Sequence, residues 1–119
     1  MGISASRRLR KQRDFKQVRA GGIRISKAPF IIQCFRGDTK AETVSRLGII
    51  ASRRVGNAVK RNRGKRICRE LFRAYTTALP LSCDLVIVLR SSFNQYSFDQ
   101  LKADYLRACV MISEKLKRG

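Results

Sequence analysis

Short apolar segments separated by polar ones run along this chain, and their pattern predicts strands. Such segments, rich in Ile, Val and Phe, fit a pleated surface that is buried on at least one face. The predicted strands cover residues 23–25, 30–35, 46–52 and 84–90. Residues 37–45 are polar and predict the turn that joins the second strand to the third. Residues 14–20 can form a short helix, which Gly21-Gly22 would end.

Two longer segments carry apolar residues at helical spacing. The first begins after Asn57, a good N-cap, and stops before Pro80, which cannot continue a helix. At about 100° per residue, one side of this helix collects Ile67, Cys68, Leu71, Phe72, Ala74, Tyr75, Ala78 and Leu79. The second begins at the capping box Ser97-Phe98-Asp99-Gln100. Its apolar stripe consists of Phe98, Leu101, Tyr105, Ala108, Cys109, Ile112 and Leu116.

The order of elements is therefore α-β-β-β-α-β-α, which predicts a single α+β domain over residues 1–119. We expect a sheet of about four strands packed by helices. Because each long helix has one apolar stripe, both should cover the same face of that sheet. Residues 1–12 are basic, and we expect them to be flexible.

The outer side of the first long helix is strongly basic. Between Arg53 and Arg69 the chain has eight Lys or Arg side chains and no carboxylate. On the helical wheel the polar side holds Asn62, Arg63, Lys65, Arg66, Arg69 and Arg73. A face that only keeps a protein soluble normally mixes Glu with Lys, whereas only Glu70 interrupts this one. The pattern favours contact with a nucleic acid over simple solvation.

Composition points the same way. The 119 residues include 27 basic and 8 acidic side chains, so the formal net charge is +19, which favours a nucleic acid as partner. The hydrophobic content of 44% argues against a disordered basic tail. No apolar run reaches the ~20 residues of a membrane span, and the N-terminus lacks an apolar signal core. We therefore expect a cytoplasmic protein without a membrane partner.

The four cysteines allow two interpretations. Cys34, Cys68, Cys83 and Cys109 include no C-x-x-C pair, and the chain has no histidine. A zinc site would need all four thiolates to be brought together by the fold. Cys68 and Cys109 lie on apolar helical sides and Cys34 in an apolar strand, so buried free thiols are the better interpretation.

The basic segment also resembles a known motif. Arg61-Asn62-Arg63 followed by Lys65-Arg66, and preceded by Gly56-Asn57-Ala58-Val59, resembles the RNR signature of the protein subunit of bacterial ribonuclease P. The resemblance covers nearly the whole chain. It implies a left-handed βαβ crossover, shared with certain ribosomal domains, although the general preference is for right-handed crossovers. It further implies that an RNA subunit holds the catalytic Mg²⁺ ions and removes the 5′ leader of precursor tRNA.

The resemblance implies two binding surfaces. The surface for the catalytic RNA would comprise Arg53, Arg54, Asn57, Lys60, Arg61, Asn62, Arg63, Lys65, Arg66 and Arg69. A groove between the sheet face and the helices would hold the precursor leader through Phe15, Arg19, Phe30 and Gln33. Asn57 can equally act as a cap alone, and both phenylalanines can equally be core residues. Arg19, Gln33 and Gly64 depart from the family pattern, which often has aromatics at the first two positions and a branched aliphatic residue at the third.

The residue types argue for binding without catalysis by the protein. Histidine is absent, the eight carboxylates are scattered along the chain, and no phosphate-binding loop is present. We expect no catalytic residue, no metal or cofactor bound by the protein, and no obligate protein partner. The main alternative is a ribosomal or ribosome-assembly protein, which would bind precursor and mature tRNA without preference. A nuclease that acts without RNA is a third, less favoured class.

Overall fold

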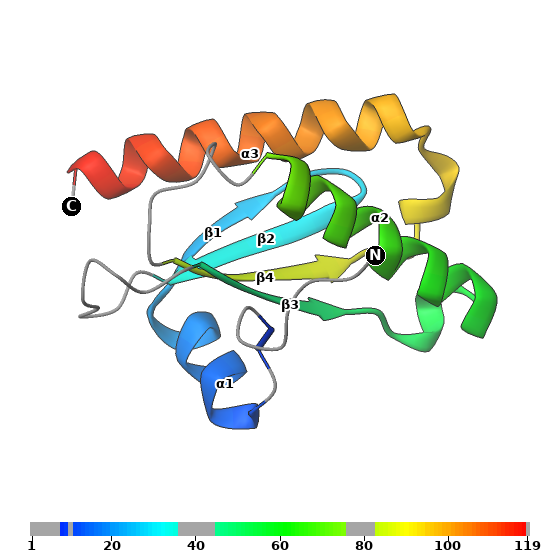
Figure 1. The fold of residues 1–119 in the computed structure, drawn as a ribbon, viewed down its shortest axis with the longest axis horizontal. Helices are drawn as coiled ribbons and strands as arrows, with labels where there is room; N and C mark the ends of the chain where they lie inside the picture. The colour runs from blue at the N-terminus through cyan, green and yellow to red at the C-terminus, as the bar shows by residue number, and fades with distance from the viewer. Residues whose placement is uncertain (1–7, 10, 36–44, 76–82, 119) are drawn as a thin grey trace.

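The computed structural model describes residues 8–9, 11–35, 45–75 and 83–118, and its elements follow the predicted order (Figure 1). The helices are α1 (Gln12–Gly21), α2 (Ala58–Ala74) and α3 (Phe98–Arg118). The strands are β1 (Ile23–Ser26), β2 (Phe30–Phe35), β3 (Arg46–Ile50) and β4 (Asp84–Leu89). Two short 3-10 turns, η2 (Arg53–Val55) and η4 (Phe93–Gln95), precede α2 and α3. Within these residues no helix is both long and apolar enough to cross a membrane.

The four strands form one mixed sheet in the order β1-β2-β4-β3. The β1–β2 and β2–β4 pairs are antiparallel, and the β3–β4 pair is parallel. Ile32 in the middle of β2 lies opposite Ile25 of β1 and Ile87 of β4, so the centre of the sheet is aliphatic. The edge strand β3 pairs with β4 and places Leu47 opposite Leu85, so its core position is also aliphatic.

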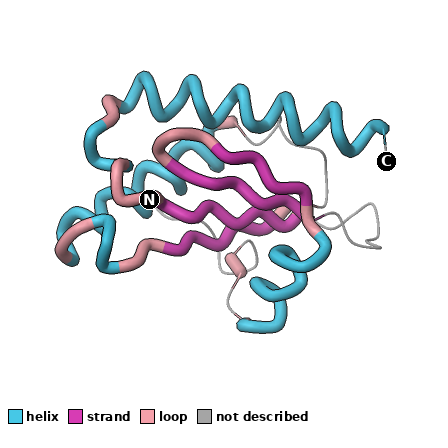
Figure 2. The backbone as a smooth tube through the Cα atoms, turned by 180° about the vertical axis from the view of Figure 1, so that it is seen from behind, coloured by secondary structure: helices cyan, strands magenta, loops and turns pink. Residues whose placement is uncertain are grey.

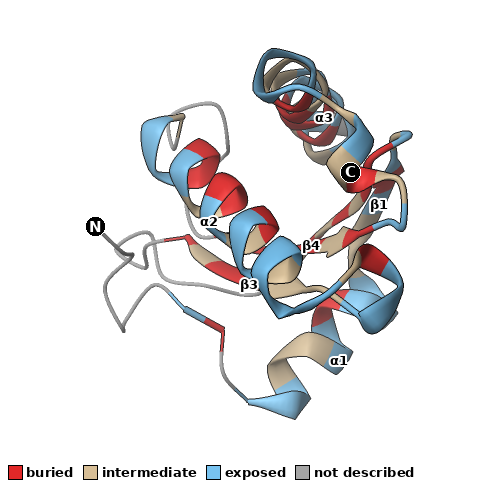
Figure 3. Ribbon diagram, turned by 90° about the vertical axis from the view of Figure 1, so that its right-hand side faces the viewer, coloured by how far each residue is buried: buried red, intermediate tan, exposed pale blue. Residues whose placement is uncertain are grey.

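Helix α2 makes the crossover from β3 to its parallel neighbour β4. It passes over the same sheet face as α3, and β4 lies on the β1 side of β3 (Figures 1 and 3). This path is left-handed, against the usual preference, and it confirms the expectation drawn from the family resemblance.

The two faces of the sheet are covered differently (Figure 2). Because successive side chains of a strand point to opposite faces, Phe30, Ile32 and Cys34 of β2 enter the core beneath α2 and α3. On the other face, Val86 of β4 joins Val18 of α1 in a smaller core. Both long helices therefore cover one face, as predicted, and α1 packs on the opposite face (Figure 3).

Two apolar positions on the long helices were predicted wrongly. Ala74 is exposed because it is the last residue of α2, where Tyr75 caps the helix; Ala78 and Leu79 lie outside the described residues. Phe98 is 41% exposed because it opens α3, one turn before the first core residue, Leu101. The capping box itself is confirmed: the Gln100 N–H donates to Ser97 Oγ at 3.2 Å, and the Ser97 N–H donates to Gln100 Oε1 at 2.9 Å.

Part of the N-terminal segment is held against the sheet. Arg8 forms a parallel bridge with Leu47 at the outer edge of β3, and the Leu9 N–H donates to the Leu47 carbonyl at 2.9 Å. The Leu9 side chain is buried in the core beneath α1. The expectation that residues 1–12 are flexible stays a prediction; residues 1–7 and 10 lie outside the described residues.

Candidate nucleic-acid interface

The start of α2 is fixed by a glycine and a cap. Gly56 has φ of 144°, a conformation that side chains rarely adopt. The next residue, Asn57, is extended, and its Oδ1 accepts the N–H of Lys60 at 3.0 Å. The predicted cap is thus confirmed, and contact of Asn57 with RNA stays a prediction. The cap sets the rotation of the helix and so determines which side chains face outward.

The outer face of α2 carries the predicted basic stripe. Ile67, Cys68, Leu71 and Phe72 are buried on its inner side. The exposed members of the predicted RNA surface are Arg53, Arg54, Asn57, Lys60, Asn62, Arg63 and Arg66. Its half-buried members are Arg61, Lys65 and Arg69. Nine of the ten predicted residues therefore lie on η2 and α2, and the tenth, Asn57, is the N-cap of α2.

Asn94 of η4 ties the two parts of this surface together. Its Nδ2 donates to the carbonyl of Val55 in η2 at 3.1 Å, and its Oδ1 accepts from Arg63 Nη1 at 3.5 Å. The turn that carries Arg53 and Arg54 is thereby linked to the RNR residues. Sequence reasoning missed Asn94, because nothing in its local pattern indicates a contact with a helix about thirty residues earlier.

On the opposite sheet face, Phe15 of α1 lies over β3. A Cβ at Gly48 would come within 2.5 Å of Phe15 Cε1 and 2.6 Å of its Cζ. Only a residue without a side chain allows the ring to approach the strand this closely. Phe15 is half-buried, so the residue is not fully enclosed in the core.

The other three predicted groove residues do not lie together. Gln33 is half-buried and shares the α1 face with Phe15, because it alternates with the core residues Ile32 and Cys34 of β2. Arg19 is exposed near the end of α1. Phe30, predicted for the same groove, is only 1% exposed and packs in the core beneath α2 and α3, with its ring centroid 6.4 Å from that of Phe93. The prediction of Phe30 as a groove residue is wrong, because the strand directs its side chain to the other face.

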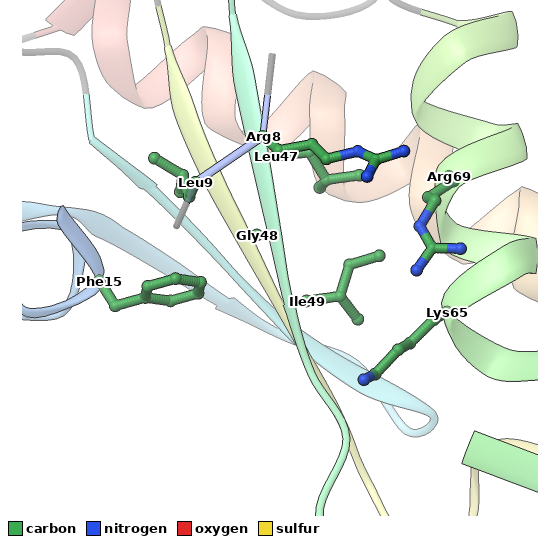
Figure 4. Close-up of a pocket in the computed structure, with 8 residues that line it drawn as sticks. All are labelled: Arg8, Leu9, Phe15, Leu47, Gly48, Ile49, Lys65 and Arg69. Atoms are coloured by element: carbon green, nitrogen blue, oxygen red, sulfur yellow. The ribbon is translucent and has the colours of Figure 1, made fainter. Parts of the chain in front are cut away.

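A pocket of about 160 Å³ lies where the two surfaces meet. It surrounds the edge of β3 and is lined by residues of the N-terminal segment, α1, β3 and α2 (Figure 4). These residues are Arg8, Leu9, Phe15, Leu47, Gly48, Ile49, Lys65 and Arg69. The lining contains three cations and no carboxylate, so it is suited to an anion.

Two carboxylates near the sheet, those of Asp84 and Asp14, already have a cationic partner. Arg46 forms a two-point contact with Asp84, with Nε–Oδ1 at 2.9 Å and Nη2–Oδ2 at 2.7 Å, and its Nη1 lies 3.7 Å from Asp14 Oδ2. The hydrogen bond from Arg46 to Asp84 raises the pKa of the guanidinium. Among the described residues, no group of three or more His, Cys, Asp or Glu side chains is arranged to hold a metal ion.

All four cysteines are buried and none forms a disulfide, which agrees with the prediction of buried thiols. Burial raises the pKa of Cys68 to about 12 and that of Cys109 to about 11. The pKa of Cys34 is also raised, by its hydrogen bond to Cys83 and by burial. The thiols of Cys34, Cys68 and Cys109 therefore stay protonated at neutral pH, and all four cysteines act as small apolar core residues.

Comparison with known proteins decides the family. The family model for ribonuclease P matches residues 3–113. This chain belongs to the ribonuclease P protein family. The ribonuclease P protein component of Nocardioides sp. is 36% identical over 114 residues, which cover 96% of this chain and 97% of that protein. The component from Shouchella clausii is 32% identical, over 85% of this chain and 81% of the relative.

Solved structures of ribonuclease P proteins have the same fold. The Thermotoga maritima protein superposes with a TM-score of 0.76 at 30% identity, covering 88% of this chain and 96% of that one. A Staphylococcus aureus mutant, described as defective in mRNA degradation, superposes with a TM-score of 0.78 at 26% identity, covering 92% and 89%. The RNR residues of this ribonuclease P protein are thus placed on a fold that its family shares.

Proposed function

We propose that this chain is the protein subunit of a ribonuclease P, binding the catalytic RNA through α2 and the 5′ leader of precursor tRNA through the α1 face of the sheet. The observation that supports this proposal is the position of the basic stripe on α2, which contains the RNR residues Arg61, Asn62 and Arg63. Its outer side chains are basic, face solvent and border a cation-lined pocket that also contains Phe15.

Helix α2 and η2 suit the backbone of a folded RNA. Arg63 and Arg66 are exposed and project from a helix that is anchored by its buried inner face. Cations held on a rigid element can contact successive phosphates without first losing their own freedom. Asn94 supports this arrangement, because it bonds the η2 turn through the Val55 carbonyl and also contacts Arg63.

The α1 face suits a single-stranded leader. Phe15 offers part of an aromatic ring on which a base can stack, and such stacking tolerates different sequences. Gln33 lies on the same face and can form hydrogen bonds, and exposed Arg19 can contact a phosphate or stack on a base. Phe30 is not part of this proposal, since it is buried beneath the other helices.

We assign the chemical step to the RNA subunit, with Mg²⁺ held by that RNA. The protein has no histidine to act as a base. Asp14 and Asp84 contact Arg46, and Asp104 lies 3.6 Å from Arg107, so three of its carboxylates already have a cationic partner. The protein would act by positioning the RNAs and by reducing their mutual repulsion. Cytoplasmic location and the lack of an obligate protein partner stay predictions.

The test is a Mg²⁺ titration of precursor cleavage by the ribonuclease P RNA, with and without the protein. We expect the protein to lower the Mg²⁺ concentration that cleavage requires, because its positive field replaces some diffuse ions. Arg63→Ala and Arg66→Ala should each weaken assembly with the RNA, and each should lower the salt dependence of binding by about one unit. Arg107→Ala is the matched control, since it removes the same charge from the outer face of α3.

Four results would count against the proposal. If the protein does not shift the Mg²⁺ titration, it has no electrostatic role. If Arg66→Ala and Arg107→Ala bind the ribonuclease P RNA equally well, the basic stripe of α2 is not the docking surface. Binding of precursor and mature tRNA with equal affinity would favour the alternative of a ribosomal or ribosome-assembly protein. Cleavage of RNA by the purified protein and Mg²⁺ alone would mean that the protein itself is the nuclease.

A further inference from the structure

The pocket at the edge of β3 brings together cations from two distant parts of the chain. Lys65 and Arg69 come from α2 and belong to the predicted RNA surface, whereas Arg8 comes from the N-terminal segment and was not predicted to bind anything. In Figure 4 the side chains of all three lie on the α2 side of β3, and Leu9 points the other way. Arg8 and Leu9 point to opposite faces because successive side chains of an extended chain alternate.

Arg8 is held in this position by two independent contacts. The hydrogen bond from the Leu9 N–H to the Leu47 carbonyl fixes the backbone on the edge of β3. The Leu9 side chain is only 6% exposed and packs in the core beneath α1, so it anchors Arg8 and Leu9 from the opposite face of the sheet. The guanidinium of Arg8 is therefore presented by a fixed backbone, although it belongs to a segment that its sequence marks as flexible.

Three cations gathered without a carboxylate repel one another, and an anion in the pocket would relieve this repulsion. At about 160 Å³ the pocket is smaller than the roughly 300–1,000 Å³ of sites for drug-sized ligands. It suits a group the size of a phosphate. Phe15 lines the same pocket, so a phosphate here would belong to a nucleotide next to the one stacked on its ring.

We propose that Arg8, Lys65 and Arg69 bind one backbone phosphate of the precursor leader as the leader passes over the edge of β3. This inference rests on the proposed function, since it assumes that the leader reaches Phe15. It adds Arg8 to the binding residues and assigns Lys65 and Arg69 to the leader as well as to the RNR surface. It also identifies the outer edge of β3 as the place where the two binding surfaces join.

The test uses the assembled enzyme, made from the full-length protein and its ribonuclease P RNA, with precursor and mature tRNA as ligands. Arg8→Ala should weaken precursor binding roughly tenfold, as expected for loss of a charged hydrogen bond. It should leave mature tRNA affinity unchanged and lower the salt slope of precursor binding by about 0.7. Arg8→Lys should keep most of the affinity, and Arg107→Ala should change neither ligand.

A second measurement locates the phosphate. Precursors are prepared with a neutral methylphosphonate at one leader position at a time. One position should weaken binding to the unaltered enzyme by roughly tenfold, and the same replacement should have little further effect with Arg8→Ala, because the contact is already lost. If every position has equal effects in both enzymes, the site does not exist.

Parallel measurements on Phe15→Ala and Arg66→Ala separate the possible failures. If these two variants behave as proposed and Arg8→Ala matches the unaltered enzyme, the phosphate site is wrong and the proposed function stands. If Arg8→Ala weakens binding of the ribonuclease P RNA and not of the precursor, the phosphate belongs to the RNA subunit, which also overturns the inference. If none of the three variants changes binding, the proposed function itself fails.

Discussion

The two faces of the sheet differ in how completely their side chains are buried. Beneath α2 and α3 the core is closed, and Phe30, Phe72, Phe93 and Tyr105 are each at most 1% exposed. Beneath α1, the buried side chains of the smaller core, among the described residues, are Leu9, Val18 and Val86, and partly exposed side chains surround them. One face stabilises the fold, and the other leaves an aromatic ring and polar groups accessible to a ligand.

Phe15 and Phe30 show how the difference arises. Both were predicted for the same groove, yet they lie on opposite faces. Phe30 begins a strand whose alternate residues enter the closed core. Phe15 lies on a short helix and meets a glycine, so its ring lies over the strand without being enclosed. Residue type alone does not separate a core aromatic from a binding aromatic; the direction of its side chain does.

The largest effect should come from the closed face. Phe30→Ala should lower the free energy of unfolding by about 3–5 kcal/mol, because it leaves a cavity among tightly packed residues. The measurement is urea unfolding of the protein alone. Phe98→Ala, which truncates an exposed aromatic on α3, should change stability by less than about 1 kcal/mol. If Phe30→Ala instead preserved stability and abolished the preference for precursor tRNA, Phe30 would be a groove residue after all.

The next effect should come from the open face and should appear in binding. Phe15→Ala should reduce the preference of the assembled enzyme for precursor over mature tRNA by about 1–3 kcal/mol, the value of one base–aromatic stack. Phe15→Leu is the matched variant, because it keeps most of the packing against Val18 and Leu9 and removes the stacking surface. Equal losses for both tRNAs would show that Phe15 only packs.

Much of the fold could be predicted because its signals are local. The cap at Asn57, the capping box at Ser97 and the alternation in β2 each depend on a few adjacent residues. The stripe on α2 is equally local, because a cap and a helical period together determine which residues face outward. The RNA surface could therefore be named residue by residue, whereas the left-handed crossover came only from the family resemblance.

The remainder depends on contacts between distant parts of the chain. The groove was placed between the sheet and the helices. Alternation in the predicted strand already puts Phe30 and Gln33 on opposite faces, but the sequence could not show which of these faces α1 and Phe15 cover. The bridge from Arg8 to Leu47 and the link from Asn94 to Arg63 join residues that no local pattern connects. Such contacts arise only when the sheet order brings the segments together.

Gly48 should control how closely Phe15 approaches β3. Gly48→Ala places a Cβ about 2.5 Å from the ring and 3.1 Å from Leu9 Cβ, so the ring must move away from the strand. We expect a loss of about 1 kcal/mol in stability from this overpacking, and a reduction in precursor preference smaller than that of Phe15→Ala. In the Phe15→Ala background the same substitution should have less effect, since the clashing ring is gone. An equal effect in both backgrounds would show that the strand, and not the ring, responds.

Gly64 on the closed face should show the smallest effect. The structure leaves no gap there: an added Cβ would lie 2.7 Å from Leu89 Cδ1 and 3.3 Å from Phe93 Cε2. Gly64→Ala gains up to about 1 kcal/mol of helix propensity, and it must displace the flexible end of Leu89, which costs a similar amount. We expect the free energy of unfolding to change by less than about 1 kcal/mol, with RNA affinity unchanged.

Gly64→Val, with the branched side chain frequent in the family, should destabilise the protein more, because the Phe93 ring has less freedom to move. A stabilised valine variant would mean that α2 can move outward, and the closed face would then be less rigid than its burial indicates.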